Sequence, residues 1–145
     1  MRLWSNDFQH GEMIPSRFTC DGEDISPHLA WEDVPEGTKS FVLIVDDPDA
    51  PMGVWKHWLL CDIPPELREI DRNSVPAGAR EITNDFGKKE YGGPCPPSGT
   101  HRYFFKLYAL DVPTIGRVNK RSIYKEVEKH KLDEAVLMGT YRRGF

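Results

Sequence analysis

Four polar side chains lie at the ends of apolar strand patterns, where they could form a small binding site. They are Asp47, His57, His101 and Tyr103. A carboxylate among apolar residues needs a hydrogen-bonded partner, and an imidazole can supply one. Imidazole N–H groups, a phenol and nearby turn amides can together hold an anion. The sequence therefore predicts an anion pocket if the strands that carry these residues converge.

Each of these residues also has a purely structural interpretation. Asp47 precedes a proline and could cap a turn. His57 could be a hydrogen-bonded core histidine, and Tyr103 could be a core tyrosine whose hydroxyl has a partner. We favour a shared site because all four residues fall at strand ends.

Two catalytic arrangements use the same residues and stay open as alternatives. Asp47, His57 and His101 could form a two-histidine, one-carboxylate metal face. Cys95 with His101 and Asp47 could form a nucleophilic triad, because a neighbouring imidazole activates a thiolate. Both rank below anion binding. Cys95 lies between two prolines in a stiff turn, and no helix N-terminus is expected there to activate its thiol.

Three segments must position these side chains. Residues 40–45 are apolar on both faces, which is typical of a strand covered on both sides, and their alternation continues to Asp47. Residues 54–63 place one row on a common face: Trp55, His57, Leu59, Cys61 and Ile63. Residues 101–110 place another row on one face: His101, Tyr103, Phe105, Leu107 and Ala109. Residues 91–99 hold three prolines and three glycines, so a stiff loop precedes the last strand.

The other segments predict short strands, turns and little helix. Extended segments are expected around residues 3–8, 14–20, 25–31 and 135–141, with a helical turn at 66–70 and a long polar connection at 73–87. One helix is expected over residues 123–129, with Ser122 as its N-cap. Short strands divided by Gly and Pro turns indicate an all-β sandwich or barrel.

Length and charge limit the function classes. The 145 residues are expected to form one domain, and no apolar run approaches the roughly 18 residues of a membrane span. The net charge is −4, although residues 117–145 carry 8 basic and 4 acidic side chains. This basic segment could meet an acidic partner. Because its charges are mixed in sign and no nucleic-acid-binding motif accompanies it, we do not expect nucleic-acid binding.

The three cysteines predict a protein without disulfides. Cys20, Cys61 and Cys95 are odd in number and widely spaced, and no Cys-x-x-Cys pair indicates a structural zinc site. The first residues also lack the apolar stretch of a signal peptide. We therefore expect reduced thiols and a cytoplasmic location.

Five motifs occur in a fixed order along nearly the whole chain. They are Asp24-Ile25-Ser26-Pro27, Asp47-Pro48-Asp49-Ala50-Pro51, His57-Trp58, Gly92-Gly93-Pro94-Cys95-Pro96-Pro97 and His101-Arg102-Tyr103. Each motif alone is weak, but the ordered set is specific. It resembles the phosphatidylethanolamine-binding proteins, a family that includes the Raf kinase inhibitor proteins. The short length and the cysteine-containing proline loop resemble the bacterial and archaeal branch.

The resemblance implies a two-sheet antiparallel β-sandwich with Greek-key-like connections, one or two short helices and a small anion pocket. Carried over by motif, the ligand-binding residues are Asp47, Ala50, Pro51, His57, Gly93, Pro96, Pro97, His101 and Tyr103. The family also implies no metal or other cofactor, and a cis peptide bond between Ala50 and Pro51. Cys95 departs from the eukaryotic pattern, which has glycine at this place.

Two functions follow as hypotheses. The first is a non-enzymatic binding or regulatory protein whose pocket accepts a phosphate, a phosphorylated headgroup or a carboxylate. His57, His101 and Tyr103 would donate hydrogen bonds, and Asp47 would orient one imidazole. The second is an interaction with a protein partner, as an inhibitor of a protease or a modulator of a signalling protein such as a kinase, through surface loops and the basic tail. The resemblance also implies a homodimer.

Overall fold

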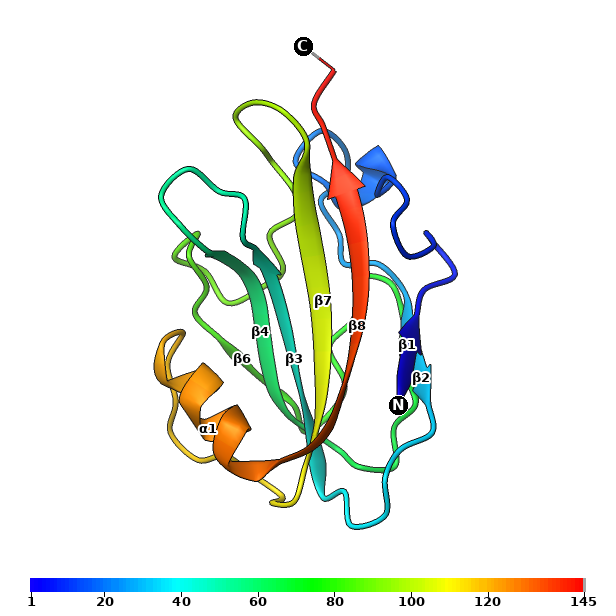
Figure 1. Cartoon of the computed structure of the whole chain (residues 1–145), viewed down its shortest axis with the longest axis vertical. Coiled ribbons are helices and arrows are strands. Elements are labelled where there is room, and N and C mark those ends of the chain that lie inside the picture. The colour runs from blue at the N-terminus through cyan, green and yellow to red at the C-terminus, as the bar shows by residue number, and fades with distance from the viewer. Residues whose placement is uncertain (145) are drawn as a thin grey trace.

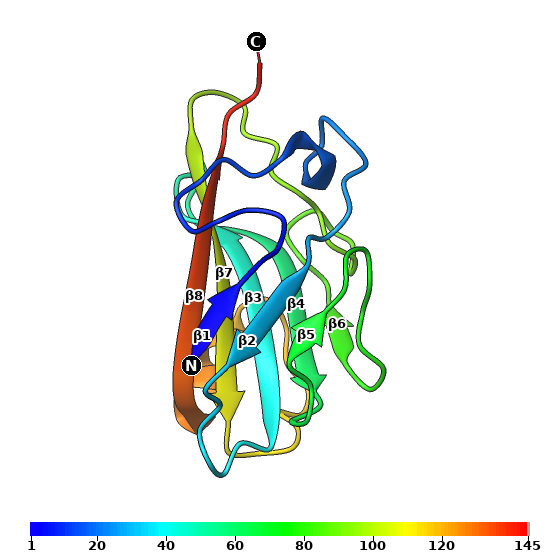
Figure 2. The same cartoon turned by 90° about the vertical axis from the view of Figure 1, so that its right-hand side faces the viewer.

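The computed structural model describes residues 1–144 and consists of two antiparallel sheets packed face to face (Figure 1 and Figure 2). The larger sheet has the order β6-β4-β3-β7-β8. Its strands are β3 (Ser40–Asp47), β4 (Trp55–Ile63), β6 (Arg80–Ile82), β7 (His101–Leu110) and β8 (Lys131–Tyr141). The smaller sheet, β1-β2-β5, comprises β1 (Arg2–Trp4), β2 (Leu29–Glu32) and β5 (Glu69–Ile70). The predicted all-β sandwich is confirmed.

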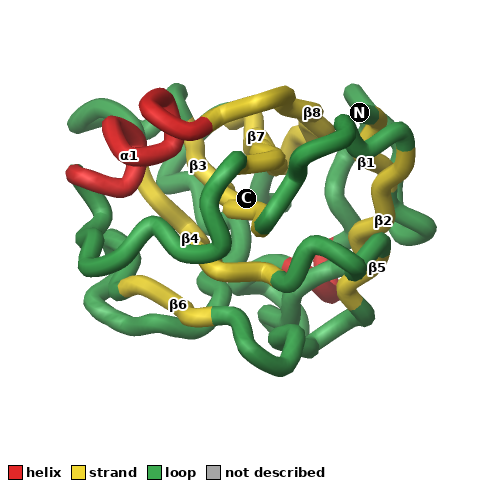
Figure 3. The backbone as a smooth tube through the Cα atoms, turned by 90° about the horizontal axis from the view of Figure 1, so that it is seen from below, coloured by secondary structure: helices red, strands yellow, loops and turns green. Residues whose placement is uncertain are grey.

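Strand β3 is buried on both faces, as the sequence predicted, and β7 beside it buries one face along its whole length and the other face only at its end. Their inward side chains pack between the two sheets; they include Phe41, Leu43, Val45, Tyr103, Phe105 and Leu107. Their outward side chains Val42, Ile44, Tyr108 and Leu110 pack under the helix α1 (Ser122–His130). Figure 3 shows α1 and the small sheet on opposite sides of the large sheet. The continuous apolar run of β3 therefore reflects cover on both faces.

Strand β4 does not keep the single alternation that the sequence predicted. Its pairing with β3 shifts register twice, and each shift is a β-bulge that turns the following side chains to the other face. Leu59 and Cys61 therefore pack under α1, whereas Trp58 and Leu60 pack between the sheets. The predicted common face of His57, Leu59 and Cys61 is wrong for this reason.

The cap of α1 also differs from the prediction. Oδ1 of Asn119 accepts hydrogen bonds from the backbone N–H groups of Arg121 and Ser122, each at 2.8 Å. The Ser122 hydroxyl instead accepts a 2.9 Å hydrogen bond from the backbone N–H of Asn119. Asn119 therefore satisfies the first amides of the helix, and the role predicted for Ser122 is wrong.

Several short segments depart from their predicted structure. Residues 14–20 contain the 3-10 helix η1 (Ser16–Phe18), and the turn predicted at 66–70 ends in strand β5, which pairs with β2. The polar connection at 73–87 contains β6, and β8 begins at Lys131 rather than at 135. Each strand is fixed by pairing with a distant segment, which local residue preferences do not report.

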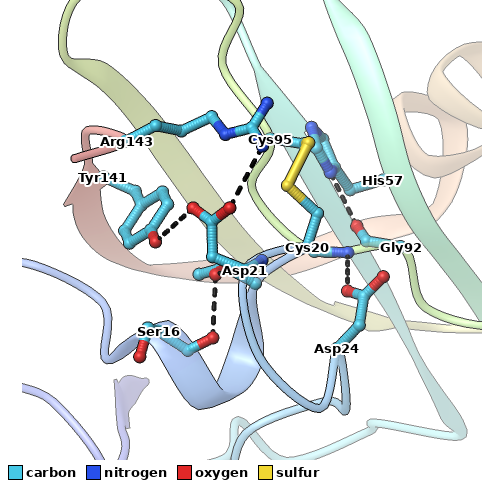
Figure 4. Close-up of a disulfide and its surroundings, with 11 residues drawn as sticks. Ser16, Cys20, Asp21, Asp24, His57, Gly92, Cys95, Tyr141 and Arg143 are labelled. Carbon is cyan, nitrogen blue, oxygen red and sulfur yellow. Dashed lines mark hydrogen bonds and ion pairs between the residues drawn. A yellow bond between two sulfur atoms is a disulfide. The ribbon is translucent and has the colours of Figure 1, made fainter. Parts of the chain in front are cut away.

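A disulfide joins Cys20 to Cys95, contrary to the prediction of reduced thiols (Figure 4). The two residues are 75 positions apart in sequence, but their Cα atoms are 5.4 Å apart. An odd number of cysteines still allows one such bond and one free thiol. That thiol is Cys61, whose pKa is raised to about 11 by burial. The cytoplasmic location stays a prediction, without support from reduced thiols.

The helices of the described residues are short. The longest, α1, has nine residues, and none is long and apolar enough to cross a lipid bilayer.

Replacing Phe105 by alanine should lower the free energy of unfolding by about 3–5 kcal/mol, because it leaves a cavity between the sheets. Phe105 is fully buried there. Phe104→Ala is the matched control, since its side chain lies on the opposite face of β7 and is half-buried. Urea unfolding followed by tryptophan fluorescence measures both variants. Equal losses at the two positions would contradict the assigned faces.

Candidate functional site

A cavity of about 220 Å³ is lined by residues from the end of β3 and from the beginnings of β4 and β7. Figure 1 shows these strand ends at the end of the large sheet away from α1. Its lining residues are Asp47, Ala50, Pro51, Trp55, His57, Phe86, Cys95, Pro96, Pro97, His101 and Tyr103. This set contains every residue that the sequence assigned to the site except Gly93. Segments far apart in the chain thus enclose one space, although His57 does not reach it by the alternation predicted for its strand.

A buried hydrogen bond ties the end of β3 to the start of β7. Nδ1 of His101 lies 2.7 Å from Oδ2 of Asp47, and both side chains are less than one tenth exposed. Oδ1 of Asp47 accepts a 2.7 Å hydrogen bond from the backbone N–H of Asp49. The carboxylate therefore caps the turn and orients the imidazole at once. Because Nδ1 of His101 is the donor, its Nε2 remains available to the cavity.

His57 reaches the cavity through the first bulge of β4. Lys56 pairs with Asp46 and Trp58 pairs with Val45, so His57 is the extra residue between two consecutive pairs. A bulge re-aims the side chain of the residue that it adds. His57 and Trp58 are consequently both buried, although a regular strand would send them to opposite faces.

The ring of His57 is held in one orientation. Its Nδ1 donates a 2.6 Å hydrogen bond to the carbonyl oxygen of Gly92, and its ring packs edge-on against Tyr103 with 5.2 Å between centroids. Burial lowers the pKa of His57 below its ordinary value of 6.5, although the Gly92 carbonyl and the Asp47 charge act in the opposite direction. At neutral pH the imidazole is therefore neutral, with an unprotonated Nε2.

Tyr103 is a lining residue whose buried hydroxyl proton has no acceptor among the described residues. Its side chain is 1% exposed, and within residues 1–144 its hydroxyl makes no hydrogen bond of standard geometry. Burial, with a contribution from Asp47, raises the pKa of Tyr103 well above 10, against a small opposite effect of the Cys95 amide. The O–H therefore stays protonated and can donate. An unpaired buried hydroxyl costs about 1–3 kcal/mol, which a hydrogen-bond acceptor in the cavity would recover.

The loop after β3 is fixed from outside by Asp49 and Arg102. The Asp49 carboxylate accepts hydrogen bonds of 2.8 to 2.9 Å from the backbone N–H and the guanidinium of Arg102. These bonds lower the pKa of Asp49 to about 2. The pair is partly exposed and contributes little stability by itself, but it restrains the loop that carries Ala50 and Pro51.

The peptide bond between Ala50 and Pro51 is trans, so the cis bond that the resemblance implied is wrong. The backbone N–H of Gly53 donates a 3.1 Å hydrogen bond to the Ala50 carbonyl and closes a four-residue turn. Pro51 occupies the second position of this turn, which suits the fixed φ of a trans proline.

Gly93 does not line the cavity and instead supports its wall from behind. Its N–H donates a 2.7 Å hydrogen bond to Oδ1 of Asp24. A Cβ atom at Gly93 would collide with the carbonyl oxygen of Phe18 and approach the Cα of Thr19 to 2.9 Å. Glycine is needed here because two backbones meet.

Three lining residues lie outside the ligand-binding set predicted from the sequence: Trp55, Phe86 and Cys95, of which Cys95 was considered only as a catalytic thiol beside His101 and Asp47. The Phe86 ring packs edge-on against His57 at 5.1 Å and against Trp55 at 5.6 Å. It is placed by Asn84, whose Oδ1 accepts the Phe86 N–H and whose Nδ2 donates to the His57 carbonyl. The Asn-Asp-Phe-Gly turn within the polar connection was the available signal.

Neither catalytic alternative fits this geometry. The Cys95 sulfur is bonded to Cys20, so Cys95 has no thiol and the proposed triad is wrong for this form of the protein. Within the described residues, no group of three His, Cys, Asp or Glu side chains is placed to hold a metal ion.

A larger and more open depression of about 670 Å³ lies between β6 and the segment before α1. Two of its basic residues are already paired, Arg80 with Asp62 and Lys120 with Asp85. Among its lining residues in the described chain, none has a buried polar side-chain atom without a partner. The smaller cavity is therefore the candidate site.

Comparison with known proteins decides the family. The profile described as phosphatidylethanolamine-binding protein matches residues 4–142. The chain belongs to the phosphatidylethanolamine-binding protein family. It is 49% identical to a UPF0098 protein of Aquifex aeolicus, covering 99% of this chain and 89% of that protein. It is 48% identical to a UPF0098 protein of Methanothermobacter thermautotrophicus, covering 99% of this chain and all of that protein. Neither name states an activity.

Solved structures agree with this assignment. Escherichia coli YbcL, described as a new member of the mammalian PEBP family, superposes with a TM-score of 0.93 at 32% identity over 98% of both chains. A Chlamydia trachomatis homologue, CT736, superposes with a TM-score of 0.91 at 37% identity over 98% of this chain and 97% of its own. The sequence comparisons therefore show the family, and the solved structures show the same fold.

The lowered pKa of His57 predicts a specific pH dependence of stability. In the unfolded chain His57 binds a proton near pH 6.5, whereas in the folded protein it binds one only at lower pH. Acidification from pH 7 to 5 should therefore lower the free energy of unfolding through this residue. An NMR titration of the ring nitrogens should show Nε2 unprotonated at pH 7 and a midpoint below 6.5. A midpoint at or above that value would contradict the burial argument.

Proposed function

We propose that this protein is a non-enzymatic binding protein whose cavity accepts a small anion: a phosphate, a phosphorylated headgroup or a carboxylate. The observation that carries the proposal is the buried Tyr103 hydroxyl, whose proton has no acceptor among the described residues, at a space lined by two imidazoles. Nδ1 of each imidazole is already committed, to Gly92 or to Asp47. The Tyr103 O–H and the two Nε2 atoms are thus left to meet one ligand.

The size of the cavity limits the ligand. A volume of about 220 Å³ corresponds to about seven water molecules at ~30 Å³ each. Pockets for drug-sized ligands begin at about 300 Å³. The cavity therefore suits one anionic group with a few attached atoms, while the remainder of a larger ligand would stay outside.

The charge of the cavity makes anion binding depend on protons. Among the described residues that line it there is no Lys or Arg, so within this set only His57 and His101 can become cationic. A neutral imidazole that donates through Nδ1 presents a lone pair on Nε2, which repels an anion's oxygen atoms. A proton must therefore enter with the anion, either on an imidazole or on the ligand itself. Binding and protonation are coupled.

Tyr103→Phe should weaken phosphate binding about 10- to 100-fold, because it removes one hydrogen bond to a charged group. Tyr108→Phe is the matched control, since Tyr108 lies on the same strand but packs under α1. Isothermal titration calorimetry with inorganic phosphate measures both variants. Unchanged affinity in Tyr103→Phe, or no binding by the unmodified protein, would contradict the proposal.

Anion affinity should fall as pH rises from 5 to 8, by about tenfold per pH unit for each proton taken up. Sulfate is the cleaner probe because it stays a dianion over this range, so the pH effect reports the protein. His101→Ala should abolish most of the binding, whereas His130→Ala should not, since His130 pairs with Asp111 outside the cavity. A flat pH profile would mean that the imidazoles take no part.

A second candidate function is favoured by the apolar rim of the cavity. Met52 is 96% exposed, Val54 48%, Phe86 40% and Trp55 37%, and Trp55 and Phe86 line the cavity as well. A protein partner such as a protease or kinase could cover this rim. Met52→Asp should then remove inhibition of that partner without changing phosphate affinity. Failure to inhibit any enzyme of a broad protease and kinase panel would count against this candidate.

A further inference from the structure

The Cys20–Cys95 disulfide, drawn in Figure 4, includes one residue of the cavity lining. Cys95 is a lining residue, and Cys20 follows η1 in a segment that packs behind the proline loop. Both cysteines are partly exposed. A reductant in solution can therefore reach the bond, and the bond joins the wall of the cavity to the N-terminal segment behind it.

Residues 91–94 each have a separate hydrogen bond to a distant part of the chain. These bonds are Tyr91 hydroxyl to Phe18 carbonyl (2.8 Å), Gly92 N–H to His57 carbonyl (3.2 Å), Gly93 N–H to Asp24 carboxylate (2.7 Å) and Cys20 N–H to Pro94 carbonyl (3.1 Å). This part of the loop would stay attached without the disulfide.

Beyond Cys95 the loop has no such support. Within the described part of the chain, no hydrogen bond or ion pair involves residues 96–100. The next anchors are His101 on Asp47 and Arg102 on Asp49. Pro96 and Pro97, which line the cavity, therefore lie in a five-residue span without hydrogen bonds. Its first end, Cys95, is held by the disulfide and by its backbone N–H, which interacts with the Tyr103 hydroxyl.

We propose that this disulfide is a redox switch for the cavity: its reduction by a dithiol frees the Pro96–Pro97 wall and weakens anion binding. The binding readout rests on the function proposed above. In the reaction, a thiolate of the dithiol attacks one sulfur, forms a mixed disulfide and releases the other cysteine as a thiolate. The second thiol of the reductant then resolves the mixed disulfide. Two electrons pass to the protein, which gains two thiols, and the dithiol becomes a cyclic disulfide.

The third cysteine does not interfere with this exchange. Cys61 is fully buried under α1, and burial raises the pKa of its thiol to about 11. It is therefore a poor nucleophile at neutral pH. The switch consists of one pair of cysteines.

The test compares phosphate affinity before and after reduction with dithiothreitol. We expect binding roughly tenfold weaker in the reduced protein, as if the freed loop kept the binding conformation about one tenth of the time. Reoxidation with oxidised glutathione should restore it. Cys20→Ser removes the disulfide without changing a lining residue. Its phosphate affinity should therefore equal that of the reduced protein and should not change when dithiothreitol is added.

A second readout does not depend on binding. Nitrogen-15 relaxation should show faster motion at Cys95, Ser98 and Gly99 after reduction, with unchanged amides in β3. Equal affinity and equal mobility in both redox states would overturn the switch, as would general loss of structure on reduction. If the oxidised protein binds no phosphate, the proposed function fails, and the relaxation data alone then decide whether reduction releases the wall.

Discussion

The site depends on one buried contact, the 2.7 Å hydrogen bond between the Asp47 carboxylate and Nδ1 of His101. It joins the end of one central strand to the beginning of the other, and the same carboxylate closes the turn at Asp49. Removing one partner would leave the other buried and uncompensated, at a cost of about 3–5 kcal/mol for a charged group. The contact also fixes which ring nitrogen of His101 faces the cavity. One hydrogen bond therefore both joins the two central strands and decides which nitrogen of His101 can meet a ligand.

The central part of the site follows from the sequence because regular strands obey a simple rule. In β7 the alternation of His101, Tyr103 and Phe105 places all three on the buried face, as the pattern predicts. The apolar run of β3 likewise predicts burial on both faces and leads to Asp47. Side chains at the same end of neighbouring strands must then lie close together. The order of the motifs along the chain predicted the family, and the comparisons with known proteins confirm it.

What the sequence did not predict arises where the chain departs from regular geometry or where distant segments meet. The face of His57 is set by a bulge, and an extra residue in a ladder leaves no signal in local hydrophobic periodicity. Phe86 reaches the cavity only because Asn84 binds the backbone of a neighbouring strand. The bond between Cys20 and Cys95 depends on a close approach that spacing along the chain does not encode.

The most direct measurement is a high-resolution crystal structure of the oxidised protein grown at pH 5.5 in saturating phosphate. We expect one tetrahedral anion in the 220 Å³ cavity, within hydrogen-bond distance of the Tyr103 hydroxyl and of Nε2 of both His57 and His101. Density for water alone at that position, with phosphate bound elsewhere on the surface or not at all, would contradict it.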